Sequence, residues 1–239
     1  MRAGSVCGIH GDFNRDVCGL FIRQIYEKFL KFLERISMKF LNSIAAAAAL
    51  AAVIASYAGA EVKAGETLYG TVLKQVSVSG DLSHKDGRLL PTNAIEVLEV
   101  KDGVVKFSIT GYQNPKAPNV IYFTPKARII AVAFSKQAKF QSESLGEEDG
   151  FNKVKITAYT DEGALSGDVD KIFASAKEKF EASCSVCHAL HQPADYEANR
   201  WPGYIKSMLS RTPISKDESW TVVQYLQKHS KDVNLKDMK

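Results

Sequence analysis

The chain is poor in cysteine, and this scarcity limits the chemistry open to it. Of the four cysteines in 239 residues, Cys7 and Cys18 lie in the first 60 residues, which leaves only Cys184 and Cys187 beyond them. In an oxidising compartment, two cysteines three positions apart either close a strained small ring or bind a group. The pair therefore marks a candidate binding site.

The chain also has little net charge once its first 60 residues are set aside. That segment holds seven Lys and Arg against four Asp and Glu, which leaves 24 basic and 23 acidic residues in the remainder. The formal charge falls from +4 to +1, so no nucleic-acid partner follows from the basic composition. With 45% hydrophobic and 24% charged residues, the chain is neither disordered nor fibrous and has room for one or two small domains.

The segment 38–60, MKFLNSIAAAAALAAVIASYAGA, has the three parts of a secretory signal peptide. A basic Lys39 precedes an apolar run, and small residues lead to a cleavage site after Ala60. Translation would then begin at Met38, and we predict that residues 1–37 are an extension from a mis-assigned start codon.

Two other interpretations of this region stay open. The amphipathic stretch FIRQIYEKFLKFLERIS at 21–37 is also typical of a membrane-surface helix. The apolar run 40–60 is long enough to remain as an uncleaved anchor. With either a signal peptide or an anchor, the rest of the chain lies outside the cytoplasm, in the periplasm.

Residues 61–163 have the pattern of short antiparallel strands. Val, Ile, Thr, Tyr and Phe recur in runs that are separated by turn residues, and odd positions between 104 and 109 are apolar. The turn pairs are Gly80-Asp81, Asp102-Gly103, Asn114-Pro115 and Asp149-Gly150. About five strands predict a small SH3-like β barrel, which we interpret as a scaffold or docking module because no catalytic cluster lies in it.

Residues 164–239 change to a helical period. Apolar residues recur at helical spacing up to Cys184, and a second helix is indicated by the capping box that begins at Ser215 and includes Glu218. The first helical stripe is formed by Val169, Ile172, Phe173, Ala176 and Phe180. The expected fold class is therefore α+β, with the SH3-like barrel followed by a small all-α domain.

The motif C-x-x-C-H, formed by Cys184, Cys187 and His188, predicts one covalently bound haem c. Two thiols at this spacing meet the two vinyl groups of a porphyrin, and the adjacent histidine lies beneath the iron as the proximal ligand. A structural zinc site would bring a second spaced pair of ligands. A redox dithiol would need a βαβ context, which this pattern does not provide.

The sequence around this motif resembles two related groups of cytochromes. AKEKFEASCSVCH and VVQYLQK are similar to the entry and C-terminal helices of class I cytochromes c, with Ala176 where glycine is more usual. EANRWPGYIKSM and QYLQKHSKD resemble the C-terminal region of the pentahaem cytochromes c that serve trimethylamine N-oxide and related S- or N-oxide reductases. This chain departs from that family because it has one C-x-x-C-H motif where the family has five.

The resemblance implies a function in anaerobic electron transport. The chain would carry single electrons to a periplasmic molybdopterin S- or N-oxide reductase. Because it lacks the other four haem motifs, it must be reduced by another protein, a membrane quinol-oxidising donor. Two alternatives stay open: an electron-accepting subunit of a periplasmic dehydrogenase, and a five-coordinate haem sensor or peroxidase-like protein.

The second axial ligand decides between a carrier and a haem with an open site. We predict Met208, which lies 20 residues beyond His188 and before the last helix. Methionine raises the potential and closes the iron to substrates, so the protein would not be an enzyme. His191 lies on the proximal side, His229 lies late in the last helix and Met238 lies at the end of the chain.

Other residues are candidates to contact the haem itself. The Arg200 guanidinium and the Trp201 indole N–H are suited to the haem propionates, although a surface arginine and a core tryptophan would read the same way. Four further residues are expected to line the pocket: Phe180, Tyr204, Tyr225 and Leu226.

Overall fold

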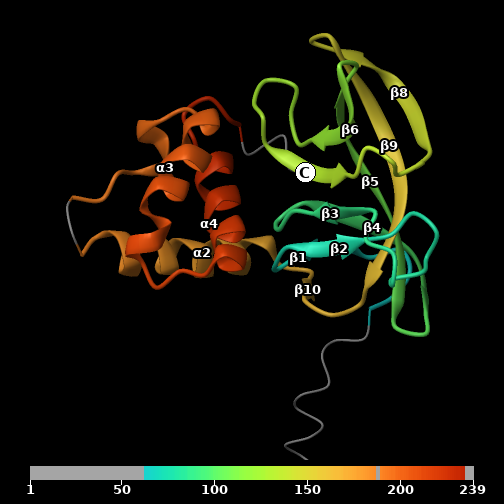
Figure 1. Cartoon of the computed structure of the whole chain (residues 1–239), viewed down its shortest axis with the longest axis horizontal. Helices are drawn as coiled ribbons and strands as arrows, with labels where there is room; N and C mark the ends of the chain where they lie inside the picture. The colour runs from blue at the N-terminus through green and yellow to red at the C-terminus, as the bar shows by residue number, and fades with distance from the viewer. Residues whose placement is uncertain (1–61, 187–188, 235–239) are drawn as a thin grey trace, which may run out of the picture. The chain divides into compact units, whose positions relative to one another are not determined.

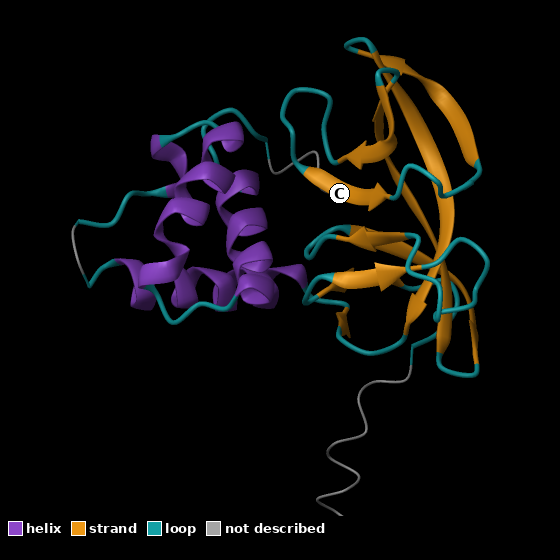
Figure 2. Ribbon diagram, viewed as in Figure 1, coloured by secondary structure: helices purple, strands orange, loops and turns teal. Residues whose placement is uncertain are grey.

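A large antiparallel β-sheet dominates the computed structural model, which describes residues 62–186 and 189–234 (Figures 1 and 2). The sheet has ten strands. They are β1 (Thr67–Gly70), β2 (Lys74–Val76), β3 (Gly87–Leu89), β4 (Ala94–Lys101), β5 (Val104–Asn114), β6 (Ala117–Tyr122), β7 (Ile130–Phe134), β8 (Ser142–Glu148), β9 (Phe151–Asp161) and β10 (Leu165–Ser166).

The long strand β5 organises the sheet. β9 pairs with it from Val104 to Gln113, while β4 pairs with its first half and β6 with its second half. Because two strands share one edge of β5 and diverge from it, the sheet curls into a half-barrel (Figure 2). An isolated bridge between Ser77 and Tyr159 joins the end of β2 to β9.

Local sequence explains the strands and their turns. The odd residues Val105, Phe107 and Ile109 are buried, as the alternation predicts. Asp102 and Gly103 have φ of 51° and 76°, so they form the two-residue turn between β4 and β5 that both-positive φ values allow. These two parts of the strand prediction are confirmed.

Three α-helices follow the sheet within the described residues. They are α2 (Val169–Cys184), α3 (Trp201–Met208) and α4 (Lys216–Lys228), with single turns of 3₁₀ helix at η1 (Pro193–Asp195), η2 (Ala198–Arg200) and η3 (Leu209–Arg211). The predicted apolar stripe lies on α2, where Ile172, Phe173, Ala176 and Phe180 are buried. Ser215 and Glu218 form the predicted capping box of α4, so both helix predictions are confirmed.

Helix α4 is tied directly to the sheet. Lys228 is fully buried, and its Nζ donates hydrogen bonds to the Thr92 carbonyl at 2.8 Å and to Asn93 Oδ1 at 3.1 Å. Gln224 Nε2 donates to the Ile130 carbonyl at 3.0 Å. Figure 1 shows α4 on the side of the helical segment that faces the strands. The helices are therefore not separated from the sheet.

The predicted fold class is wrong. In place of a five-stranded SH3-like barrel and an independent all-α cytochrome c domain, the described residues form a curled ten-stranded sheet with three short helices. The helices and the sheet lie in one compact unit that begins at Val62. The cause is the polar face of α4, which donates hydrogen bonds to sheet carbonyls and so replaces the water that an independent helix would face.

The predicted domain boundaries and the N-terminal segments stay predictions. The division into 61–163 and 164–239 stays a prediction. The upstream extension 1–37 and the signal peptide or anchor at 38–60 lie outside the described residues. Within the described part, no helix is long and apolar enough to span a bilayer.

Candidate functional site

An apolar cavity of about 300 Å³ lies among the helices. It is lined from the end of α2, the segment that follows it, α3 and η3. The described lining residues are Phe180, Ser183, Cys184, Leu190, His191, Tyr196, Trp201, Tyr204, Ile205, Met208, Arg211 and Thr212. A thiol, a thioether and four aromatic rings therefore face one space.

Helix α2 brings Cys184 to this cavity. Asp168 caps the helix by accepting a hydrogen bond from the Lys171 N–H at 3.1 Å, and the buried stripe fixes the rotation of the helix. Phe180 lies one turn before Cys184 and meets the Trp201 ring edge to face, with 6.1 Å between centroids. Cys184 is consequently held at the last residue of a packed helix.

Helix α3 carries Trp201, Tyr204 and Met208 on successive turns, so all three face the same side. The Trp201 side chain is 2% exposed, and its indole N–H donates to the Pro193 carbonyl at 3.1 Å. Tyr196 packs against Trp201 and Tyr204, at centroid distances of 5.2 and 4.6 Å. This packing holds the ring of Trp201 rather than its N–H toward the cavity.

The predicted site residues fall into three groups. Cys184, Trp201 and Met208 line the cavity together, as do the expected wall residues Phe180 and Tyr204. Arg200 is exposed and is not a lining residue. Cys187 and His188, together with Met238, lie outside the described residues.

Other expected residues have different surroundings. Tyr225 and Leu226 belong to the hydrophobic cluster beneath the cavity and do not line it. His191 does line it, within 3.3 Å of the Tyr196 hydroxyl. His229 caps α4, where its Nδ1 lies 2.7 Å from the Tyr225 carbonyl and burial lowers the pKa of its imidazole.

The cavity suits the haem that the motif predicts. Aromatic and aliphatic walls match a porphyrin face, Cys184 supplies one of the two thiols, and Met208 supplies a thioether that iron binds. One permanently charged side chain, Arg211, is among the described lining residues. Sequence reasoning missed Arg211; its position three residues after Met208, on the same helical face, is the signal that could have identified it.

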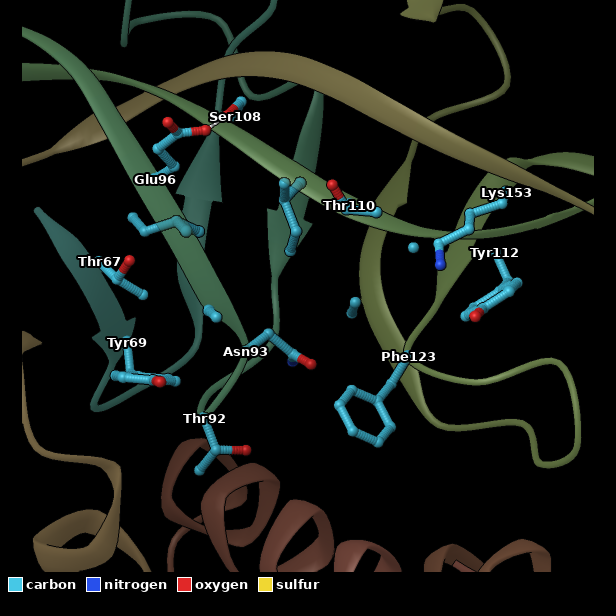
Figure 3. Close-up of a pocket in the computed structure, with 15 residues that line it drawn as sticks. Thr67, Tyr69, Thr92, Asn93, Glu96, Ser108, Thr110, Tyr112, Phe123 and Lys153 are labelled. Atoms are coloured by element: carbon cyan, nitrogen blue, oxygen red, sulfur yellow. Dashed lines mark hydrogen bonds between the residues drawn. The ribbon is translucent and has the colours of Figure 1, made fainter. Parts of the chain in front are cut away.

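A second cavity, of about 330 Å³, lies against the sheet (Figure 3). Figure 3 shows Thr92 and Phe123 at one end and Glu96 beside Ser108 at the other. Glu96 accepts hydrogen bonds from Lys155 and Ser108, both at 2.9 Å, and these bonds hold the pKa of its carboxyl below the ordinary value. None of the described residues that line this cavity is Cys, Met or His, so it offers iron no such ligand.

Thr92, at one end of the second cavity, is strained. It is 1% exposed, its φ is 63°, and its hydroxyl has no hydrogen-bond partner in the described part of the chain. The Lys228 ammonium donates a hydrogen bond to the Thr92 carbonyl. Across the described residues, no group of three or more His, Cys, Asp or Glu side chains is arranged to hold a metal ion.

Comparison with known proteins gives a match to one family model and matches to curated cytochromes c. Residues 62–165 match the TorC third cytochrome c domain, a range that ends within β10 and so covers the sheet. The cytochrome c-type protein TorC of Escherichia coli K12 is 26% identical over 175 residues, which span 70% of this chain and 45% of TorC. The cytochrome c-type protein TorY of Haemophilus influenzae is 23% identical over 182 residues, or 73% of this chain and 48% of TorY.

The chain thus spans about half the length of the curated relatives that it matches. No solved structure matches it significantly. The family resemblance seen in the sequence is confirmed by these matches: the chain is similar in sequence to the TorC and TorY cytochromes c, and its residues 62–165 match the TorC third cytochrome c domain.

Proposed function

We propose that this protein is a periplasmic electron-transfer cytochrome with one covalently bound haem c. Cys184 and Cys187 attach the haem, His188 is the proximal iron ligand, and Met208 is the distal ligand. When bound, the haem supplies reversible one-electron chemistry at its iron. The observation that carries the proposal is that Cys184 and Met208 line the same apolar cavity.

The residues around the cavity have clear tasks in this proposal. Phe180, Trp201 and Tyr204 exclude water from the haem, which favours the less charged, reduced state. Trp201 acts by packing, since its N–H is already bonded to Pro193. With His188 and Met208 both bound, the iron has no open position, so the protein transfers electrons and has no turnover of its own.

We infer the direction of electron flow from the resemblance of EANRWPGYIKSM and QYLQKHSKD to the cytochromes c that serve S- or N-oxide reductases. The names of the curated relatives identify TorC and TorY as cytochrome c-type proteins. By homology, this chain accepts electrons from a membrane quinol-oxidising cytochrome and delivers them to a periplasmic molybdopterin oxidoreductase that reduces S- or N-oxides. Export through a signal peptide, or retention by an anchor, places it on the same side of the membrane as that reductase.

The test is a mass and visible spectrum of protein purified from the periplasm of a host that matures c-type haem. We expect a mass increase of one haem and a mature N-terminus at Glu61 if the signal peptide is cleaved. A chain without haem would overturn the proposal.

The distal ligand is tested separately with Met208→Ala. We expect this variant to keep its covalent haem, to fall in midpoint potential and to bind carbon monoxide rapidly when reduced. Ser207 is the exposed neighbour of Met208 and does not line the cavity, so Ser207→Ala is the matched control. Rapid carbon monoxide binding by the unaltered protein would instead favour the five-coordinate sensor.

A further inference from the structure

The charge of Arg211 is unusual for its position. Arg211 ends η3 and lines the cavity, where the other described lining residues are apolar, aromatic or uncharged polar apart from His191. Within the described residues, its guanidinium has no carboxylate within ion-pair distance. Arg211 is an exposed residue, so water solvates its charge, and the guanidinium can bind an anion that enters the cavity.

The haem is a group that brings such an anion. Its two propionates are carboxylates, and the planar fork of a guanidinium binds a carboxylate through two parallel hydrogen bonds. Arg200, the propionate partner expected from the sequence, does not line the cavity. The indole N–H of Trp201 already donates to the Pro193 carbonyl.

Local structure orients Arg211. Met208 ends α3 and Arg211 follows it by three residues, so the expected iron ligand and the guanidinium lie on the same face of one helical segment. Thr212 ends that segment and fixes it by donating its Oγ1–H to the Leu209 carbonyl at 3.0 Å. The charge is therefore carried on a built turn rather than on an open loop.

From these contacts we propose that Arg211 binds a haem propionate and thereby sets the potential of the iron. The inference rests on the proposed function, because it needs a haem in this cavity. The guanidinium stabilises the reduced haem more than the oxidised haem, since the oxidised iron centre carries one more positive charge than the reduced one. Arg211 is accordingly a positioning and tuning residue, with no part in iron ligation.

The experiment measures midpoint potentials of the haem-loaded protein and of three variants by spectroelectrochemical titration. Arg211→Gln removes the charge and the fork, Arg211→Lys keeps the charge, and Arg200→Gln removes a nearby charge outside the lining. Arg200 is a close control because its charge acts on the phenol of Tyr196, a lining residue whose pKa is raised chiefly by desolvation.

We expect Arg211→Gln to shift the reduction equilibrium toward the oxidised state on the order of tenfold, about 59 mV for one electron. Arg211→Lys should fall between that variant and the unaltered protein, and Arg200→Gln should shift the equilibrium much less. If Arg211→Gln fails to load haem, the midpoint potentials of Arg211→Lys and Arg200→Gln still decide the matter. A larger fall in Arg211→Lys than in Arg200→Gln supports the role of Arg211, and an equal or smaller fall overturns it.

Two results separate this inference from the proposed function. In the first, haem and methionine ligation are intact, but the potential of Arg200→Gln shifts as much as that of Arg211→Gln or more. This result would overturn the role of Arg211 and leave the proposed cytochrome function in place. Absence of haem from the unaltered protein would instead remove the proposed function itself.

Discussion

The sheet and the helical segment of this protein fill their interiors in different ways. The core of the sheet is a closed cluster of mainly aliphatic side chains, with Phe107 at its centre at 0% exposure. The helical cluster is built around Phe173, Phe180, Trp201 and Tyr225, and it leaves a cavity of about 300 Å³ beside it. A cavity of about 330 Å³ also lies against the sheet, but of these two cavities only the helical one has a cysteine and a methionine among its described lining residues. This difference in lining favours the helical segment as the part that receives a group.

The region that matches a known domain also differs from the region that holds the expected haem ligands. The TorC third cytochrome c domain covers residues 62–165, whereas Cys184 and Met208 lie beyond that range. The domain match and the expected haem ligands are thus carried by different regions. Hydrogen bonds from α4, together with the bond from the Arg128 N–H to Asn199 Oδ1, join the sheet to the helical segment.

The largest effects on stability are expected from removing one buried aromatic ring from each of the two regions. Phe107→Ala and Trp201→Ala should each lower the free energy of unfolding by about 3–5 kcal/mol, because each removes a buried ring. Only Trp201→Ala should also change the visible spectrum and the potential of the haem. Urea denaturation and spectroelectrochemistry measure the two effects, and a spectral change in Phe107→Ala would show that the regions are not distinct.

The contact between the regions is probed by Lys228. Burial lowers the pKa of its ammonium from 10.5 to about 7, so the unfolded chain binds one more proton than the folded chain between these two values. Stability should therefore rise with pH across that window, with a slope of up to about 1.4 kcal/mol per pH unit. It should be lowest below about pH 7, where the buried charge persists.

Lys228→Met should remove this part of the pH dependence. Urea midpoints at several pH values measure it. The charge of Lys228 helps to lower the pKa of His229, so the two curves are compared above the ordinary histidine pKa of 6.5, where the imidazole is neutral in both proteins. Parallel curves for the two proteins would contradict the buried charge.

A smaller effect is expected at the start of α4. Ser215→Ala removes the hydroxyl that accepts a hydrogen bond from the Glu218 N–H at 3.2 Å, and should cost about 1 kcal/mol. Hydrogen bonds from Lys179 and Ser215 lower the pKa of Glu218 to about 2, so the loss should persist at mildly acidic pH. Ser210→Ala, at an exposed position, is the control. An equal loss of stability in both variants would show that the cap does not stabilise α4.

The smallest effect is expected on β8, whose seven residues are all exposed. Leu145→Ser should change stability by no more than about 0.5 kcal/mol. Ile156→Ser on the neighbouring β9, where the side chain is 1% exposed, should be strongly destabilising. If Leu145→Ser were as destabilising as Ile156→Ser, the Leu145 side chain would have to be packed against another part of the protein.

Elements with a periodic apolar pattern could be predicted from the sequence, and elements without one could not. The stripe on α2, the Ser215 capping box and the Asp102-Gly103 turn have local causes. Strand β8, SESLGEE, has no alternation because neither of its faces is buried, so it was missed. The short strands β3 and β10 hold only three and two residues, too few for a pattern.

The docking of α4 on the sheet could not be predicted because its contacting residues are polar. Gln224, Gln227 and Lys228 have the sequence pattern of a solvated helix face, yet each is at most 3% exposed. Most of their partners on the sheet side are backbone carbonyls, which leave no trace in side-chain patterns. At the site, spacing predicted Met208, whose side chain lines the cavity with Cys184, whereas Arg211 follows from the shape of the cavity.

The bond from Lys228 to Thr92 also bears on the order of folding. It spans 136 residues, and the bond from the Thr221 hydroxyl to the Thr71 carbonyl spans 150. Contacts between such distant residues form slowly, because a long loop must close before they stabilise anything. We therefore expect the sheet to form first and α4 to dock last, so that the helical segment reaches its final packing only after the sheet has formed.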